Sequence, residues 1–267
     1  MTIQIERLAS RLDDAACNAT AVSQHTEADG LTMENAYTVQ RALVDRRLAR
    51  GHHAIGMKMG FTSRAKMAQM GLSDLIWGRL TSDMRIEEGG SIDARRYVHP
   101  RCEPEICFLL GKPLEGEVTP LQAMAAVEAM APAIELIDSR YENFKFSLAD
   151  VVADNASSSG LVVGNWHRPD IDCANLGLVL SVNGRAVELG STAALLGHPV
   201  RSLVAAARLA SAAGEPLQAG SLVMAGGVTA AIALAAGMHV RCEMQYMGTV
   251  SFSVRAQQDN APSADRS

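Results

Sequence analysis

Three glutamates occupy positions where carboxylates are costly, and their spacing suggests a shared task. Glu103 and Glu105 lead directly into the apolar run 106–110, and Glu135 lies inside a second apolar run, 133–137. Side chains two apart on a strand point to the same face, so Glu103 and Glu105 would lie side by side. Carboxylates crowded together out of water repel each other and tend to take up protons. A divalent cation would keep all three ionised, and carboxylate oxygens suit Mg²⁺ or Mn²⁺.

Lys58 is the one charged residue in the apolar run 55–59. A buried lysine is rare unless it is paired, so Lys58 could neutralise a substrate carboxylate or exchange a proton as an acid or base. The residues alone leave simpler alternatives open. Lys58 could point to solvent from an alternating strand. Glu103 and Glu105 could occupy an exposed edge, and Glu135 could form a salt bridge.

Three further segments are rich in the small and polar residues that suit the lining of a ligand pocket. Two of them cover 138–146 and 152–160, and the third is a glycine pair after the short apolar run 222–224. Loop side chains offer hydrogen-bond donors and acceptors, and glycines let backbone N–H groups approach a ligand oxygen. An ordinary surface turn is the alternative for each segment. The candidate ligand-binding residues are Ser139, Arg140, Asp154, Asn155, Ser157, Gly226, Gly227 and Thr229.

The elements that must position these side chains begin with helices. Apolar residues at spacings of three and four predict a first helix near the N-terminus. A second helix is expected between Thr32, a good N-cap, and Gly51, a good terminator. A third is expected over 199–212, because proline stands at its first turn.

After His53 the chain consists mainly of short apolar runs of strand length, with a strong hairpin signal at Asn183-Gly184. Many strands with few helices between them predict an α+β fold with a mixed or antiparallel β core. We divide the chain into a helical part at 1–52, a catalytic core at 53–256 and a flexible polar tail at 257–267. The expected strands are 54–59, 106–110, 133–137, 161–163, 176–182, 185–189, 222–224, 240–247 and 249–254.

Composition excludes several classes of protein. The 267 residues are 48% hydrophobic, enough to bury a sizeable core, so a wholly disordered chain is excluded. The net charge of −5, without a basic stretch, argues against nucleic-acid binding. We expect no membrane partner and a cytoplasmic location, because no run suits a membrane span and the N-terminus does not resemble a signal peptide. The five cysteines lack C-x-x-C spacing and are expected to be reduced and buried.

An ordered set of motifs resembles the hydratase/decarboxylase branch of the fumarylacetoacetate hydrolase superfamily over residues 30–255. Each motif alone is weak, but the set in this order is specific. The motifs are GMKMGFTS from Gly56, HPRCEPEI from His99, ELIDSRYENFKF from Glu135, ADNASS from Ala153, LGHP from Leu196 and AGGVTAA from Ala225.

The resemblance implies a fumarylacetoacetase-like mixed β-roll core with a small helical N-terminal part. It implies Mg²⁺ or Mn²⁺ held by Glu103, Glu105 and Glu135, with Lys58 as a catalytic residue. The implied reaction is decarboxylation of the 2-oxo dicarboxylate 2-oxo-3-hexenedioate to 2-hydroxypenta-2,4-dienoate and CO₂, in meta-cleavage catabolism of aromatic compounds. A homo-oligomer is also implied, as is a complex with the hydratase that consumes this dienol.

Two alternatives to the decarboxylase are open. Hydratases of this branch carry an acidic residue shortly before an aromatic-glycine pair, where this chain has Ile76 before Trp77-Gly78. Ile76 cannot hydrogen-bond a water, so we predict decarboxylation, with Ile76 near the distal end of the substrate, and keep dienol hydration as the alternative. A non-catalytic partner of the hydratase is the alternative from another class. The three glutamates and Lys58 argue against it, since a scaffold has no use for converging carboxylates.

Overall fold

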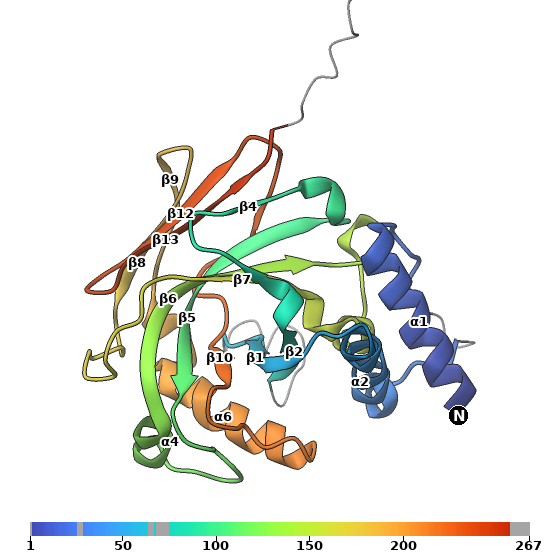
Figure 1. The fold of residues 1–267 in the computed structure, drawn as a ribbon, viewed down its shortest axis with the longest axis horizontal. Helices are drawn as coiled ribbons and strands as arrows, with labels where there is room; N and C mark the ends of the chain where they lie inside the picture. Colours follow the sequence, from blue (N-terminus) through green and yellow to red (C-terminus); the bar gives the residue numbers. More distant parts are fainter. Residues whose placement is uncertain (1, 26–28, 64–66, 68–74, 257–267) are drawn as a thin grey trace, which may run out of the picture.

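The computed structural model describes residues 2–25, 29–63, 67 and 75–256, so the tail predicted at 257–267 lies outside the described residues. Two β-sheets form its centre (Figure 1). The larger sheet contains β1 (Ala54–Gly60), β2 (Ile76–Thr81), β3 (Arg85–Ile86), β5 (Pro100–Leu110), β6 (Val127–Asp138), β7 (Ser158–Val163), β10 (Leu222–Met224) and β11 (Ile232–Ala233). The smaller sheet contains β4 (Ser91–Ile92), β8 (Gly177–Val182), β9 (Arg185–Ser191), β12 (His239–Met244) and β13 (Gly248–Val254).

Both sheets are mixed, as the distribution of short apolar runs predicts. The larger has the order β2-β1-β10-β5-β6-β7-β3, with β11 also paired to β5. Its longest pairing, β5 with β6, is antiparallel, whereas β1–β10 and β3–β7 are parallel. The smaller has the order β4-β13-β12-β8-β9. The α+β fold with a curled mixed β core is therefore confirmed.

The helices begin at residues that satisfy their first N–H groups. Described helices are α1 (Thr2–Asn18), α2 (Met33–Ala49), α4 (Pro120–Ala126), α5 (Leu148–Ala153) and α6 (Pro199–Ala212). Thr32 and Asn35 form a reciprocal capping box at the start of α2, and the His198 side chain accepts from Val200 N before α6. Single 3₁₀ turns cover Ser82–Met84, Ala94–Arg96, Glu142–Phe144, Asn155–Ser157 and Thr192–Ala194.

The main hydrophobic core lies between the two sheets. Phe108 of β5 and Leu136 of β6 pack in one buried cluster with Val240 of β12 and Phe252 of β13. A second cluster joins α1 and α2 to the start of β2 and to α5, with Leu12, Leu43 and Val152 fully or almost fully buried. Figure 1 shows α1 and α2 side by side at one end of the molecule, far from the β8–β9 hairpin. The division at 52/53 stays a prediction.

Two features differ from the expectations. β5 starts at Pro100 and β6 runs from Val127 to Asp138, so both strands are longer than their apolar runs. Glu103 and Glu105 therefore lie inside β5 and not at its mouth, because flanking strands cover even its polar residues. Four of the five free cysteines are buried as expected, but Cys17 is exposed, since α1 turns it away from the buried cluster.

Candidate metal centre and cavity

The antiparallel register of β5 and β6 brings the three glutamates together. Glu103 lies directly opposite Glu135, and Glu105 is two residues further along β5 on the same face. One carboxylate oxygen from each of the three lies within 4.8 Å of the others. The residues are 32 positions apart in the chain at most, so strand pairing, and not local sequence, creates the cluster.

Burial makes this cluster electrostatically costly. Glu105 and Glu135 are both 0% exposed. Burial raises the pKa of Glu135 to about 7 and, together with the neighbouring Glu135 and Glu103, raises the pKa of Glu105 well above its usual range. Oε1 of Glu105 and Oε1 of Glu135 have no hydrogen-bond partner among the described residues. Carboxylates in this state favour either proton uptake or a bound cation.

The glycine pair after β10 fits closely against two of these carboxylates. The N–H of Gly226 donates to Glu105 Oε2 at 2.8 Å, and Gly226 has a φ of +110°, which favours glycine. A Cβ on Gly227 would overlap the carboxylate of Glu103. The backbone of Gly226 therefore contacts Glu105, and the absence of a side chain on Gly227 leaves space for the carboxylate of Glu103.

Lys58 of β1 is the one cation at the cluster among the described residues. Its side chain is almost fully buried, and Nζ lies 3.0 Å from Glu135 Oε2. Burial alone would lower the pKa of Lys58, but the charges of Glu135, Glu103 and Glu105 outweigh it and raise the pKa. One ammonium facing three carboxylates leaves the cluster with excess negative charge. The alternatives of a solvent-facing Lys58 and an exposed strand edge are excluded by this burial.

The donor set fits a hard divalent cation. Three carboxylates supply oxygen ligands, two of them with buried oxygens that lack any other partner. Oxygen-rich sites with few protein ligands suit Mg²⁺ or Mn²⁺, which keep coordination positions for water or substrate. Residual negative charge after pairing with Lys58 is what such a cation would neutralise.

A cavity of about 260 Å³ adjoins the cluster. Lys58, Glu103 and Gly227 stand in its lining, together with Ile76 and Ser157, so five of the predicted site residues meet there. Its walls are otherwise mainly apolar. Most of these wall residues do not stand out in the sequence, because aromatic and aliphatic residues are also what a core requires. They are Phe61, Thr62, Ser63, Ile137, Phe144, Phe146, Val151, Ala156 and Ala231.

Several wall residues have backbone conformations that non-glycine residues rarely adopt. Phe61, Phe144, Ala156 and Ser157 all have φ between 50° and 59°. Such conformations cost free energy and persist only where the surrounding structure holds them, often at functional sites. Their concentration around one cavity marks it as the candidate active site.

The chain is similar to known proteins over most of its length. A family model described as "Fumarylacetoacetate (FAA) hydrolase C-terminal" matches residues 49–255. The chain belongs to the fumarylacetoacetate hydrolase family. A 4-oxalocrotonate decarboxylase from Pseudomonas sp is 64% identical over 94% of this chain and 98% of its own. A 2-hydroxyhexa-2,4-dienoate hydratase from Comamonas testosteroni is 34% identical over 93% of this chain and 95% of its own.

A solved structure is similar over nearly the whole chain. It is the 4-oxalocrotonate decarboxylase from Pseudomonas putida G7 complexed with magnesium and adipate. The TM-score is 0.92 at 39% identity, and the match covers 95% of this chain and 98% of that one. The resemblance inferred from the motifs is therefore confirmed at the level of both sequence and fold.

In this member of the fumarylacetoacetate hydrolase family, other predicted site residues hold the protein together. Arg140 and Asp154 are buried and form an ion pair, and Arg140 also donates to Ser159 Oγ. Asn155 accepts from the N–H of Arg79 and donates to its carbonyl, which clamps β2. None of Arg140, Asp154 and Asn155 is among the described residues that line the cavity.

The remaining candidates are also placed outside the lining. Ser139 is fully buried and its Oγ accepts from the N–H of Tyr141. Thr229 donates to the carbonyl of Ala230 and its methyl group packs near Gly190. Gly226 acts on Glu105 through its N–H, behind the lining. Direct contact of Ser139, Gly226 and Thr229 with a ligand stays a prediction, as it does for Arg140, Asp154 and Asn155.

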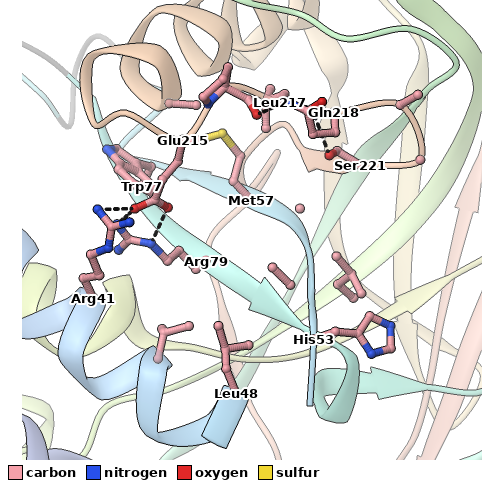
Figure 2. Close-up of a pocket in the computed structure, with 18 of the residues that line it drawn as sticks. Arg41, Leu48, His53, Met57, Trp77, Arg79, Glu215, Leu217, Gln218 and Ser221 are labelled. Carbon is pink, nitrogen blue, oxygen red and sulfur yellow. Dashed lines mark hydrogen bonds and ion pairs between the residues drawn. The ribbon is translucent and has the colours of Figure 1, made fainter. Parts of the chain in front are cut away.

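A second pocket lies on the opposite face of β1, and it contains a paired group of charges, Glu215 with Arg79 and Arg41. Met57 lines this pocket of about 590 Å³, whereas the next residue, Lys58, lines the cavity. Figure 2 shows Glu215 meeting two arginines across it. Arg79 donates to both carboxylate oxygens of Glu215, each at 2.8 Å, and Arg41 lies 3.2 Å from Oε1. We call this second pocket the Arg–Glu pocket, and we call the cavity of about 260 Å³ beside the three glutamates the glutamate cavity.

Among the described residues, no helix is both long enough and apolar enough to cross a membrane.

Proposed function

We propose that this chain decarboxylates 4-oxalocrotonate (2-oxo-3-hexenedioate) to 2-hydroxypenta-2,4-dienoate and CO₂, using Mg²⁺ or Mn²⁺. The observation that carries the proposal is the convergence of Glu103, Glu105 and Glu135 beside Lys58 at one end of a largely apolar cavity. Identity of 64% to a 4-oxalocrotonate decarboxylase supports this substrate over the dienol of a hydratase, for which a relative is 34% identical.

The reaction breaks the bond between C5 and C6 of the substrate, and C6 leaves as CO₂. The bonding electrons move through the C3=C4 double bond to the oxygen on C2, which takes up a proton to give the dienol. Glu103, Glu105 and Glu135 would hold a divalent cation, which would supply a Lewis acid at the end of the substrate where this negative charge grows. The substrate's C1 carboxylate and C2 oxygen therefore belong at the glutamate end of the cavity.

Lys58 supplies positive charge at the same end. Its ammonium lies beside the carboxylate cluster, where it can stabilise charge on the C2 oxygen and donate the proton that completes the enol. Glu135, 3.0 Å away, fixes the position of Nζ. The glycine turn places Gly226 N–H on Glu105, which holds that ligand in orientation.

The apolar walls act on the other end of the substrate. The leaving carboxylate loses its charge as CO₂ forms, so walls with few hydrogen-bond donors favour the product of this step over the anion. Ile76 in particular offers no group to position a water, which hydration of the dienol would require. Ile76→Asp should impair decarboxylation, because a new anion repels the distal carboxylate of the substrate.

The test supplies each substrate separately to the purified chain with Mg²⁺. We expect release of CO₂ from 4-oxalocrotonate and much slower loss of 2-hydroxypenta-2,4-dienoate. Faster consumption of the dienol than of the dicarboxylate would replace the decarboxylase with the hydratase. No turnover of either substrate, with metal bound, would favour the non-catalytic alternative.

We also propose a setting for the reaction. The chain acts in the cytoplasm, as a homo-oligomer that associates with the hydratase for which its product is the substrate. Support comes from the instability of a free dienol, which rewards direct transfer between two enzymes. Co-purification of the two proteins, followed by light scattering, tests both the oligomer and the complex.

A further inference from the structure

We infer that Arg101 is a specificity-determining residue that binds the distal carboxylate of a dicarboxylate whose other end lies at the three glutamates. The inference rests on the proposed function for the identity of the substrate. The position and environment of Arg101 carry it; Arg101 belongs to the motif HPRCEPEI but is not among the predicted ligand-binding residues.

Strand geometry places Arg101 one step from the metal ligands. Arg101, Glu103 and Glu105 alternate along β5 and therefore share one face of the strand. Across the β5–β6 pair, Glu103 lies opposite Glu135, and Arg101 lies opposite Ile137, which lines the glutamate cavity. Arg101 and Glu103 are two positions apart on the strand, so their Cα atoms are about 7 Å apart.

Arg101 also has a charge that the described residues leave unmatched. It is half-buried, and no ion pair or side-chain hydrogen bond joins it to another described residue. Its guanidinium carbon lies 4.1 Å from the centre of the Phe144 ring, which lines the cavity. The structural arginines Arg79 and Arg140 differ, since each is held by a carboxylate.

Phe144 connects Arg101 to the cavity: its ring lines the cavity and contacts the guanidinium, although Arg101 is not itself among the described lining residues. The backbone of Phe144 is left-handed, with φ of 56°, a conformation that is strained for a bulky residue. Stacking on an aromatic ring leaves the N–H groups of an arginine free at the rim of its plane. A guanidinium placed in this way is pre-organised for a carboxylate, which it can bind through two parallel hydrogen bonds.

The length of the substrate matches this spacing. A six-carbon chain spans roughly 6 Å between its end carbons, from bonds of about 1.5 Å. With C1 and C2 at the glutamates, the C6 carboxylate would lie about one strand step away, on the side of the cavity lined by Ile137 and Phe144, which neighbour Arg101. Because the contact is lost when CO₂ leaves, Arg101 favours the dicarboxylate over the five-carbon dienol and assists product release.

The experiment compares two six-carbon acids by calorimetry on the Mg²⁺-loaded full chain. Adipate carries a carboxylate at each end, and hexanoate carries one. We expect the wild type to bind adipate roughly ten- to a hundred-fold more tightly than hexanoate, the range for a hydrogen bond to a charged group. Arg101→Met should lose this preference while binding hexanoate as before. Arg101→Lys should keep part of it.

Arg241→Met is the matched control, because Arg241 lies on β12 in the smaller sheet and pairs with Glu243 on the protein surface. It should keep the full preference for adipate. The proposal is overturned if the wild type binds both acids equally, a result that needs no variant, or if Arg101→Met retains the preference. In kinetics, Arg101→Met should raise KM for 4-oxalocrotonate more than it lowers kcat. The binding assay needs no turnover, so absence of decarboxylation would count against the proposed function alone.

Discussion

The glutamate cavity and the Arg–Glu pocket lie on opposite faces of β1, and their charges are balanced in opposite ways. In the Arg–Glu pocket one carboxylate, Glu215, meets two guanidiniums (Figure 2). Burial would raise the pKa of Glu215, but the hydrogen bonds and charge of Arg79 outweigh it and lower the pKa. In the glutamate cavity three carboxylates meet one ammonium, and burial raises the pKa of Glu135 to about 7.

The difference separates a structural group of charges from a binding site. Glu215, Arg79 and Arg41 of the Arg–Glu pocket satisfy one another, and Trp77 covers Arg79 with its ring centre 4.5 Å from the guanidinium. Nothing further is required there for stability. The glutamate cavity is stable as a folded site only if protons or a cation offset its excess negative charge. The Arg–Glu pocket is the larger of these two cavities, at about 590 Å³ against 260 Å³, so volume does not identify the one suited to chemistry.

Replacing Lys58, the cationic side chain of the glutamate cavity, should have the largest effect on turnover. Lys58→Ala is expected to fold and to lose roughly 10²- to 10⁴-fold in kcat, the usual contribution of a positioned acid or base. The measurement is steady-state kinetics with saturating Mg²⁺, with circular dichroism to verify folding. A kcat close to that of the wild type would reduce Lys58 to a structural counter-ion of Glu135.

The affinity of the glutamate cavity for Mg²⁺ should increase with pH. The raised pKa values of Glu105 and Glu135 mean that a bound cation displaces protons near neutral pH. Affinity for Mg²⁺ should rise between about pH 6 and 8, by up to about tenfold per unit for each proton released. Calorimetry in buffers of different ionisation enthalpy measures both the affinity and the protons. An affinity independent of pH would show that the carboxylates are already ionised without metal.

The pKa shifts of Glu135 and Glu215 give opposite pH trends in the stability of the metal-free protein. The folded-state pKa of Glu135 lies above its ordinary value of 4.5, so its contribution to stability falls as pH rises from 4.5 towards about 7. The pKa of Glu215 is lowered from 4.5, so its contribution is present above that pH and is lost as pH falls through the folded-state value.

The smallest effect on turnover is expected from the Arg–Glu pocket. Glu215→Gln removes the charge that two arginines share and leaves Arg79 without a full counter-ion, which should cost about 1–3 kcal/mol in the free energy of unfolding. Activity per folded molecule should match that of the wild type. Urea unfolding and initial rates measure the two quantities. A loss of kcat without a loss of stability would assign the Arg–Glu pocket a functional role.

The metal-ligand candidates could be predicted because their cost is visible in the sequence. Two carboxylates at strand spacing and a third within an apolar run have few structural explanations, and the motif order identified the family. What local sequence could not show is the register that sets Glu103 opposite Glu135, since strand pairing depends on the whole sheet.

The roles of the polar candidates were harder to predict, because the sequence does not show which partner a polar loop residue contacts in the fold. Arg140 and Asp154 satisfy each other across 14 positions, and Asn155 satisfies Arg79 across 76. Such pairs look like ligand groups until the fold joins them. Arg101 is the opposite case, a residue that the sequence did not select as a ligand-binding candidate. It belongs to the motif HPRCEPEI, but only the structure shows its position on β5 and the absence of an ion-pair partner among the described residues.

Titration of Mg²⁺ into chelator-treated protein tests the central claim most directly, namely that Glu103, Glu105 and Glu135 hold the cation that activity requires. We expect the wild type to bind Mg²⁺ and to regain decarboxylation in proportion to occupancy. Glu135→Gln should lose more than about 100-fold in affinity, since even residues behind the ligands are worth 10–100-fold, while Glu215→Gln should bind as the wild type does. Full activity after exhaustive chelation, or unchanged Mg²⁺ affinity in Glu135→Gln, would contradict it.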